Sequence, residues 1–326
     1  MHIALVCDHP DAVLVHKPTW VADGFRAAGH SVVPVYDLAG VRSADEECDL
    51  VLFDHKASGM NRAALAELAR RPRRAVWVQW WRDLIAMDAS KRLPDQDYFR
   101  AFAAVMRGMD IVFVKERSLV DEYHQLGINA RWLDQACPAE MPACEHRQRP
   151  DWDVLVLGST GYVQRRADAR ALADAGFRVL WTGMAGSDPV SSGVQWQPWV
   201  HPLKLPELAS RCGVVLGVDW RSDLPGYTSD RTYLACGMGA CYIARCHDDS
   251  SPPATLAAWV YSRSDELIAV VRAAMSDVDE RRRRGQRSRR LIMDQHTYAH
   301  RAAEIVEIVA RNGRDSTAQG ATLGGG

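Results

Sequence analysis

The stretch at 158–161, Gly-Ser-Thr-Gly, has the residue types that bind a phosphate group. An apolar run from Trp152 to Leu157 predicts a strand before it, and a helix is expected from Val163. A turn of small residues between a strand and a helix exposes backbone N–H groups at the positive end of the helix, which suits an anion. An ordinary tight turn explains these residues equally well: Gly158, Ser159, Thr160 and Gly161.

Two arginines, Arg165 and Arg166, follow this turn in the first turns of the expected helix. There a guanidinium reaches the same phosphate, although a solvated pair is the alternative. The stretch lacks the full G-x-G-x-x-G spacing, and no acidic residue ends the next expected strand near Trp181. A nicotinamide dinucleotide is therefore disfavoured.

A second stretch, 226–240, reads GYTSDRTYLACGMGA and predicts a helix at 231–236 that Gly237 ends. The residues before this helix suit its cap: Thr228, Ser229 and Asp230. A capped structural helix explains them, but the helix dipole disfavours an arginine in the first turn. Arg231 therefore favours a bound anion, and we expect its side chain to face that ligand rather than the core.

The elements that must position these residues are strands that alternate with helices. Strands are expected in the first half at 2–7, 31–36, 50–53, 75–80, 110–115 and 130–133. Helices are expected between them at 18–28, 61–71 and 116–126. Hairpins cannot join strands separated by such helices, so the pattern predicts a mostly parallel sheet covered by helices. Core packing is the ordinary cause of the tryptophans at 77, 80 and 81.

The same alternation restarts after a proline-containing stretch, with strands expected at 152–157, 178–181, 213–218 and 240–244. We predict an α/β protein of two Rossmann-like domains with parallel sheets. The predicted parts are a first domain at 1–134, a linker at 135–150, a second domain at 151–297, a last helix at 298–311 and a disordered tail at 312–326.

Length and composition agree with this division. The chain has 326 residues and a mass of 36.3 kDa, enough for about two domains. Hydrophobic residues at 47% and charged residues at 25% exclude disordered, collagen-like and small disulfide-scaffold proteins. A net charge of −1 provides no global attraction to nucleic acid or to an anionic membrane.

Localisation and metal content follow from what the sequence lacks. The start has no basic region and no long apolar run, so we expect a cytoplasmic protein without a membrane span. The 8 cysteines show neither C-x-x-C pairs nor zinc-ligand spacing, so we expect reduced thiols. The short D-x-D patterns recur by chance, and we assign no metal.

Four segments carry a resemblance to a known family: GSTGYVQRR, WQPWV, YTSDRTYLACGMGA and HTYAHRAAEIVEIV. Over roughly residues 150 to 311 they resemble the C-terminal half of GT-B glycosyltransferases of the family 1/4-like group, and most of all the spore-maturation (CgeB-like) group. The resemblance implies two domains facing across a cleft, with the acceptor held by 1–134 and the nucleotide-sugar by 151–297. It implies that the last helix crosses back to the first domain. It also implies a nucleotide-sugar donor, such as a UDP-sugar, with no other cofactor.

The resemblance also assigns roles to residues. It places Gly158 to Gly161 beside the diphosphate, with Ser229 and Arg231 binding it, and Trp199 with Val200 near the nucleobase. One position departs from the family pattern. Leu234 stands where the family usually has a carboxylate that holds the ribose, and Asp230 is the substitute one turn away.

An inverting transfer also needs a base for the acceptor hydroxyl, and it must come from the first domain. Such groups lie beyond the carboxyl ends of parallel strands. Our candidates are His16 after the first strand, His55 after the third and Asp83 after the fourth. A surface histidine or a helix-capping aspartate is the commoner explanation, and a retaining enzyme needs no such base.

Clustered arginines leave other functions open. A segment at 281–290 and the arginines at 70, 71, 73 and 74 suit a phosphate-tracking surface, as in a phage-type DNA glycosyltransferase that acts on a hydroxymethylated base. A solvated helix neutralised by nearby acids is the alternative. The remaining alternatives are a nucleotide-sugar epimerase and a two-lobed binding protein without turnover.

Overall fold

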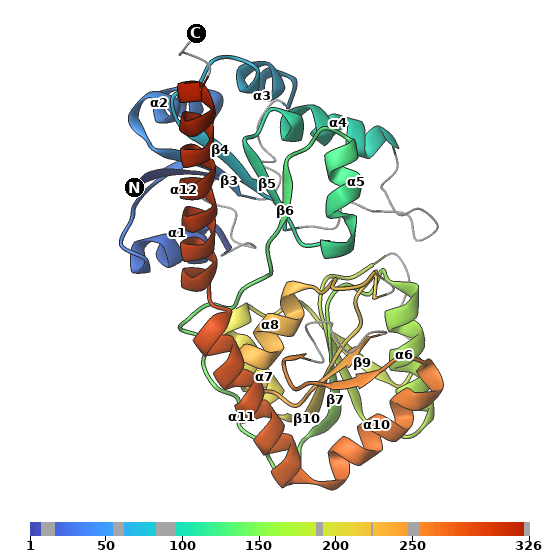
Figure 1. Cartoon of the computed structure of the whole chain (residues 1–326). Helices are drawn as coiled ribbons and strands as arrows, with labels where there is room; N and C mark the ends of the chain where they lie inside the picture. The colour runs from blue at the N-terminus through green and yellow to red at the C-terminus, as the bar shows by residue number, and fades with distance from the viewer. Residues whose placement is uncertain are drawn as a thin grey trace. The chain divides into compact units, whose positions relative to one another are not determined.

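The computed structural model describes residues 1–7, 17–54, 62–82, 96–186, 192–222, 224–246 and 255–322. Their contacts divide the chain into two compact units. One unit consists of Met1–Asp134 with Tyr298–Gly326, and the other of Gln135–Thr297 (Figure 1). Each unit is built on a parallel six-stranded sheet covered by helices, so the predicted fold class of two Rossmann-like parallel-sheet units is confirmed.

The first unit has the strand order β2-β1-β3-β4-β5-β6, with every neighbouring pair parallel. Its strands are β1 (His2–Val6), β2 (Ser31–Val35), β3 (Leu50–Asp54), β4 (Val76–Trp80), β5 (Ile111–Val114) and β6 (Ala130–Trp132). Its helices are α1 (Lys17–Ala27), α2 (Leu38–Glu47), α3 (Arg62–Ala69), α4 (Gln96–Arg107), α5 (Val120–Gln125) and α12 (Tyr298–Thr322).

The apolar runs of the central strands explain this sheet. All residues of β3 and β5 are buried, as expected for parallel strands covered on both faces. Trp77, Trp80 and Trp81 are at most 1% exposed, so they are core residues as predicted. The indole N–H of Trp77 donates to Asp45 Oδ1 at 2.8 Å, which satisfies its polar atom.

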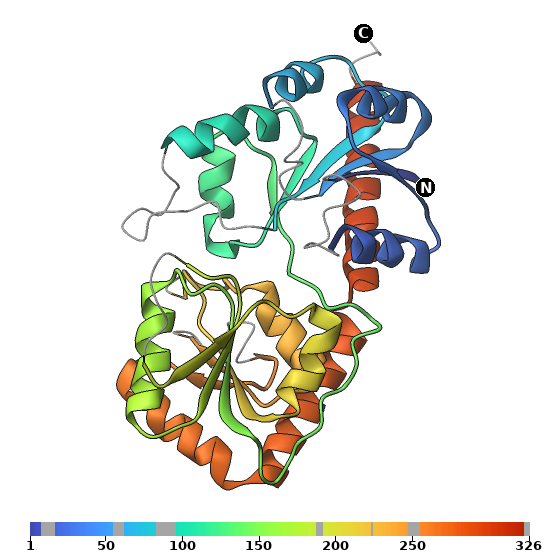
Figure 2. The same cartoon turned by 180° about the vertical axis from the view of Figure 1, so that it is seen from behind.

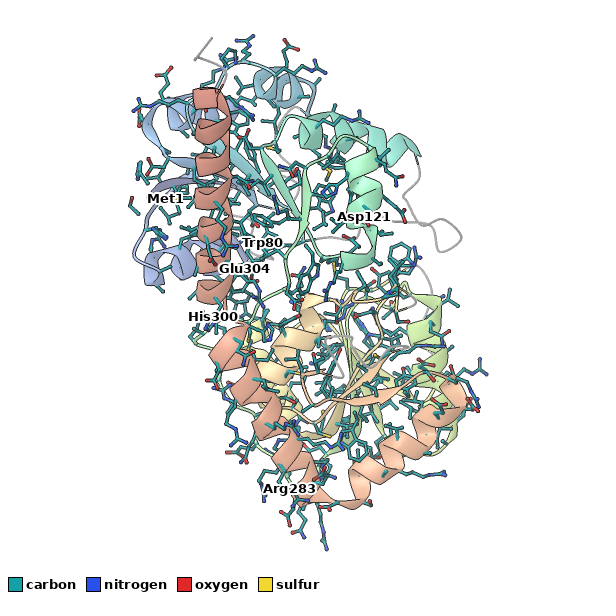
Figure 3. The ribbon with its side chains drawn as sticks, in the orientation of Figure 1. Met1, Trp80, Asp121, Arg283, His300 and Glu304 are labelled. Carbon is teal, nitrogen blue, oxygen red and sulfur yellow. The ribbon has the colours of Figure 1, made fainter. Side chains whose placement is uncertain are left out.

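Helix α12 returns to the first unit and packs along α1, as both views show (Figures 1 and 2). A Cβ atom added at Gly24 would lie 2.6 Å from the backbone of Tyr298, so only glycine permits this approach. Trp80 lies beside the start of α12, with its ring centroid 6.0 Å from that of Tyr298 (Figure 3). The helix continues to Thr322, where we had expected it to end at 311 and a disordered tail to follow.

The second unit has the strand order β12-β11-β10-β7-β8-β9, again all parallel. Its strands are β7 (Trp152–Leu157), β8 (Val179–Thr182), β9 (Val194–Gln197), β10 (Cys212–Gly217), β11 (Tyr242–Arg245) and β12 (Trp259–Tyr261). Its helices are α6 (Val163–Asp174), α7 (Leu205–Ala209), α8 (Asp230–Gly237), α10 (Ser264–Ser276) and α11 (Val278–Gln295). Among the described helices of both units, none is long and apolar enough to cross a membrane.

Candidate functional site

The middle of the second sheet provides a place for a ligand. From β7 the chain continues to β8 on one side, and β10 lies on the other side, so the strand order reverses at β7. Ligands of open parallel sheets bind at the carboxyl ends of the strands on either side of such a reversal. Gly158 directly follows β7, and Asp219 comes shortly after β10.

The turn at 158–161 is held by backbone contacts. Gly158 has φ +113°, a conformation that other residues rarely adopt, and its N–H donates to Thr182 O at 3.0 Å. Thr160 is buried, and its hydroxyl accepts from the N–H of Gly186 at 2.5 Å. Ser159 Oγ accepts from the N–H of Gly161 at 3.2 Å, which orders the exposed end of the turn.

Arg165 does not reach outward to a ligand, so this part of the prediction is wrong. Its side chain is fully buried, and Nη1 donates to Ser159 O at 2.6 Å. Nε and Nη2 donate to Val218 O at 3.2 and 2.6 Å. The physical reason is the helical period, because Arg165 lies on the buried face of α6 with Asp168 and Leu172. Arg165 therefore ties the turn after β7 to the end of β10.

Asp219 is a functional candidate that the sequence analysis missed. It is 8% exposed and accepts from Thr228 Oγ1 at 3.1 Å. It also accepts from the N–H and the hydroxyl of Ser229 at 3.0 and 2.5 Å. Through these bonds the carboxylate fixes the residues that precede α8. An acidic residue directly after a central strand was the signal that could have identified it.

Arg231 lies in the same network, and its Nη2 donates to Asp219 Oδ1 at 2.9 Å. Its side chain is 17% exposed, so it is ion-paired and largely buried rather than turned outward as we had expected. The carboxylate of Asp219, opposed by burial, raises the pKa of Arg231, so this guanidinium stays charged. Its Nε is buried without a hydrogen-bond partner.

The two predicted stretches meet at Gly158. A Cβ atom added there would lie 2.8 Å from Arg165 Nη1 and 3.3 Å from Arg231 Cδ. Both guanidinium side chains therefore pack directly against the turn. Burial, and after it the charge of Arg231, lowers the pKa of Arg165 to about 9. The site thus combines two largely buried cations, the N-terminus of α8 and a single buried carboxylate that bonds to Arg231.

The other residues that we predicted to bind the donor lie in the loop after β9 and at the start of α8. Trp199 and Val200 are half-buried in the loop after the edge strand β9 and pack on the core of the second unit. Asp230 is the first residue of α8 and is half-buried. Leu234 is 3% exposed within the core, so its side chain contributes apolar packing.

Aromatic and apolar side chains surround the turn and were also missed. Tyr162 and Trp220 are half-buried, and their ring centroids lie 5.0 Å apart. The guanidinium of Arg165 lies 4.5 Å from the centre of the Tyr162 ring. Val163 is 72% exposed and Met184 is 68% exposed, and the carbonyl of Met184 bonds to the turn at Thr160. Exposed apolar groups of this kind suit the edge of a binding site.

The predicted bases in the first unit, His16, His55 and Asp83, lie outside the described residues. Asp54 ends β3 and forms a buried ion pair with Arg82 Nη2 at 2.5 Å. Within the described parts of the chain, no group of three or more His, Cys, Asp or Glu side chains is arranged to hold a metal ion.

A comparison with protein families identifies the family of the chain that carries this site. A family model described as "Glycosyl transferase-like" matches residues 142–307, about half of the chain. The chain belongs to the glycosyl transferase-like family. The match includes the turn after β7, Asp219 and the start of α8. No curated protein matches this member of the family in sequence at a significant level.

Solved structures of glycosyltransferases have the same fold. Sucrose-phosphate synthase from Thermosynechococcus elongatus has 13% identity and a TM-score of 0.67 over 97% of this chain and 100% of its own. T4 phage β-glucosyltransferase has 12% identity and a TM-score of 0.64 over 95% and 99%. A glycosyltransferase involved in avilamycin A biosynthesis has 14% identity and a TM-score of 0.59 over 94% and 96%. The predicted GT-B fold is thus confirmed, while the narrower resemblance to the spore-maturation group stays a prediction.

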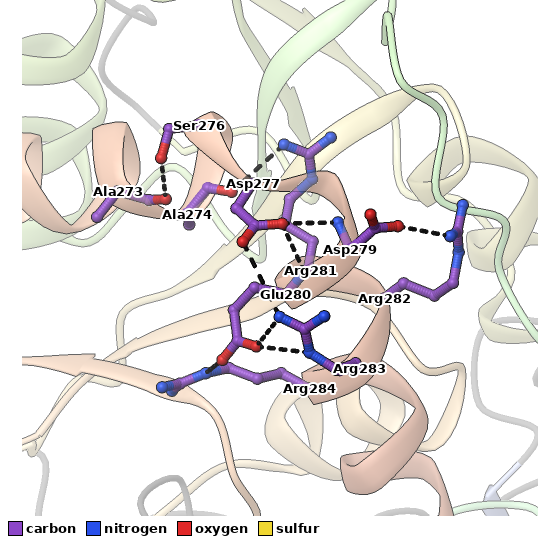
Figure 4. A network of polar contacts seen from close by, with 10 residues as sticks. All are labelled: Ala273, Ala274, Ser276, Asp277, Asp279, Glu280, Arg281, Arg282, Arg283 and Arg284. Atoms are coloured by element: carbon purple, nitrogen blue, oxygen red, sulfur yellow. Dashed lines mark hydrogen bonds and ion pairs between the residues drawn. The ribbon is translucent and has the colours of Figure 1, made fainter.

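The first arginines of the arginine-rich segment in this glycosyltransferase-like chain are ion-paired within α11 (Figure 4). Arg282 pairs with Asp279 at 2.9 Å, and Glu280 pairs with Arg283 at 2.9 Å and with Arg284 at 2.8 Å. Arg281 is buried and donates to backbone carbonyls. Three of the arginines near residue 70 are bonded in a similar way, namely Arg70 to Glu67, Arg73 to Asp110 and Arg74 to the carbonyl of Glu46. These contacts favour the solvated helix over a phosphate-tracking surface.

Proposed function

We propose that the protein transfers a sugar from a nucleotide-sugar donor to an acceptor hydroxyl, with the diphosphate bound at the carboxyl edge of the second sheet. The turn at 158–161, the N-terminus of α8 and Arg231 hold the diphosphate in this proposal. The N–H and the hydroxyl of Ser229, which we had predicted to bind the diphosphate, both donate to Asp219 and so fix the start of α8 instead. Arg165 and Asp219 are positioning residues beneath it. The nucleobase lies near Trp199 and Val200.

The observation that supports this proposal most strongly is the excess of positive charge at Gly158. Arg165 donates its hydrogen bonds to the carbonyl oxygens of Ser159 and Val218, and Arg231 donates to the carboxylate of Asp219. Burying a charge without its own ion-pair partner is costly, and burial together with the charge of Arg231 lowers the pKa of Arg165 although the carboxylate of Asp219 opposes them. A diphosphate provides the missing negative charge. The unsatisfied Nε of Arg231 provides a further donor, and the positive end of the α8 dipole favours an anion at the same place.

The apolar surroundings suggest how the rest of the donor binds. Trp220 follows β10, on the opposite side of β7 from the loop that carries Trp199. If the nucleobase lies near Trp199, the sugar end of the donor lies toward Tyr162 and Trp220, whose rings can stack on the C–H face of a sugar. A solved structure of T4 phage β-glucosyltransferase contains UDP-glucose, which supports a UDP-sugar as the first donor to test.

The chemistry follows from this charge distribution. The acceptor oxygen attacks the anomeric carbon, the bond from that carbon to the diphosphate oxygen breaks, and the diphosphate leaves with the electron pair. The guanidinium of Arg231 and the N-terminus of α8 stabilise the charge that develops on the leaving group. In an inverting reaction, a base takes the proton of the acceptor hydroxyl. His16, His55 and Asp83 stay our candidates for that base.

The test combines binding and turnover. A thermal-shift screen over nucleoside diphosphates and their sugars should identify the donor, since a ligand at one hundred times its Kd stabilises by about 2.7 kcal/mol. Arg231→Gln removes the charge and should weaken donor binding at least tenfold. Arg178→Gln is the matched control, because Arg178 is ion-paired with Asp153 at the start of β8. Equal donor binding by both variants would contradict the proposal.

Product analysis separates the alternative functions. Release of nucleoside diphosphate together with a glycosylated acceptor supports transfer. An altered nucleotide-sugar without an acceptor indicates an epimerase, and binding without turnover indicates a binding protein. We propose that transfer needs no metal, so EDTA should leave the rate unchanged. Donor turnover that requires hydroxymethylated DNA, with DNA binding that weakens steeply with salt, would identify the DNA acceptor.

A further inference from the structure

A cavity lies in the second unit, at the opposite edge of the sheet from the proposed diphosphate site. Its volume is about 400 Å³, within the range of small-molecule sites. Its walls come from the segment at 143–146, from the turn between α8 and β11 at Met238 and Gly239, and from three residues of α11. That turn precedes β11, so the cavity is at the amino edge of the sheet.

Hydrogen bonds build the cavity from these three segments. The N–H of Cys144 donates to Met238 O at 2.7 Å, and His146 Nε2 lies 2.8 Å from Gly239 O. Arg289 Nη1 donates to the carbonyl of Gly237 at the end of α8. Every wall of the cavity is therefore bonded to the turn after α8, which makes the site preformed.

Two glycines bring α11 against that turn. Gly239 has φ +75°, a conformation that favours glycine. A Cβ atom added at Gly285 would overlap the carbonyl oxygen of Gly239 and lie 2.8 Å from His146 Nε2. This close contact fixes the face of α11 that carries Arg282, Gln286 and Arg289, which are spaced by four and three residues.

The lining is positively charged and rich in hydrogen-bond donors. Arg282 and Arg289 each have five N–H donors. Nη1 of Arg282 donates to Asp279, which is outside the lining, and Nη1 of Arg289 donates to the carbonyl of Gly237. Among the described residues that line the cavity, Glu145 is the only acid, and it is exposed. Burial, opposed by its bond to Gly239, lowers the pKa of His146, and the positive field of Arg281 and Arg282 lowers it further.

We propose that this cavity binds a phosphorylated small molecule about the size of a sugar phosphate. The guanidinium groups of Arg282 and Arg289 donate hydrogen bonds to the phosphate oxygens. Gln286 lies between these two arginines in the sequence, on the same face of α11. The remaining volume, lined by Ala143, Cys144 and Met238, takes the uncharged part of the ligand. The site is separate from the proposed diphosphate site.

The experiment titrates the full chain with glucose 6-phosphate by calorimetry, in the Arg231→Gln background so that the diphosphate site does not contribute. Gln286→Glu adds one negative charge to the cavity, so it should weaken binding about fivefold or more. Arg287→Gln changes the net charge equally on an exposed side chain outside the lining, and it should leave binding unchanged. Glu145→Gln removes the acid and should tighten binding.

The outcomes decide the proposal. Saturable binding of glucose 6-phosphate that follows this order, with no binding of uncharged glucose, supports it. No saturable binding, or equal binding by the Gln286→Glu and Arg287→Gln variants, overturns it. Because donor binding is measured separately, with nucleoside diphosphates and wild-type Arg231, failure here leaves the proposed transferase function unaffected.

Discussion

Replacing Gly158 by alanine tests the contact between the turn and the two arginines. Gly158→Ala introduces a methyl group at a positive φ of +113°, only 2.8 Å from Arg165 Nη1. Gly176→Ala is the matched control in the same unit, because Gly176 has φ +89° and its added Cβ would have no atom within 4 Å. The control therefore measures the backbone cost alone.

The structure gives the expected sizes of both effects. A non-glycine residue in a left-handed conformation costs roughly 1–2 kcal/mol, which is the whole cost expected for Gly176→Ala. Gly158→Ala adds overpacking against Arg165 and Arg231, which typically costs about 1–3 kcal/mol. With an additional cost of about 2 kcal/mol, the Gly158 variant should melt roughly 4–8 °C below the Gly176 variant.

Two assays follow the substitution. Calorimetric melting compares the stabilities, and titration with UDP compares the binding of a diphosphate. We expect Gly158→Ala to lose at least tenfold in UDP affinity, because the methyl group displaces the guanidinium groups, while Gly176→Ala keeps its affinity. Equal melting temperatures and equal UDP affinities would refute the packing of Gly158 on the arginines.

Three further changes have defined outcomes. Asp219→Asn leaves two largely buried guanidinium groups without that carboxylate, so the free energy of unfolding measured in urea should fall by about 3–5 kcal/mol. A fall of less than about 1 kcal/mol would contradict the hydrogen-bond network around Asp219. The pKa of Arg165 in the folded protein is about 9, so its charge is present below pH 9 and is lost above it. The affinity for ADP should therefore fall as the pH rises from 8 to 10. A constant affinity would argue against a charged Arg165 in the site. Gly285→Ala would normally stabilise a helix by about 1 kcal/mol, but here the methyl group would overlap the carbonyl oxygen of Gly239. The variant should therefore have a lower melting temperature than the wild type. A higher melting temperature would contradict the close contact between α11 and the turn at Gly239.

Much of the fold was predictable because the pattern of apolar runs is long and regular. Residues 50–53 of β3 and 154–157 of β7 are buried on both faces, and a continuous apolar run between turn residues indicates such a strand. Helices α2 and α4 were missed. The residues of α2 include polar side chains over most of its surface, and only Val41 and Ala44 are buried. The apolar period of α2 is therefore weak in the sequence.

The candidate site was predictable in its segments and less so in its side chains. The turn after β7 and the start of α8 carry local signals, since small residues and helix caps have recognisable spacing. Asp219 has a weaker signal, because it is an acidic residue that follows a central strand, and the sheet order is needed to show that this strand lies next to β7. The burial of Arg165 was within reach of the sequence, because its spacing of three and seven residues to Asp168 and Leu172 matches one helix face.

The most direct test of the diphosphate site is a crystal structure of the protein with bound UDP. We expect phosphate oxygens within about 3 Å of the guanidinium of Arg231 and of backbone N–H groups at the start of α8. We also expect the diphosphate to lie against the turn at Gly158. A diphosphate bound elsewhere, with Arg231 bonded only to Asp219, would contradict the account.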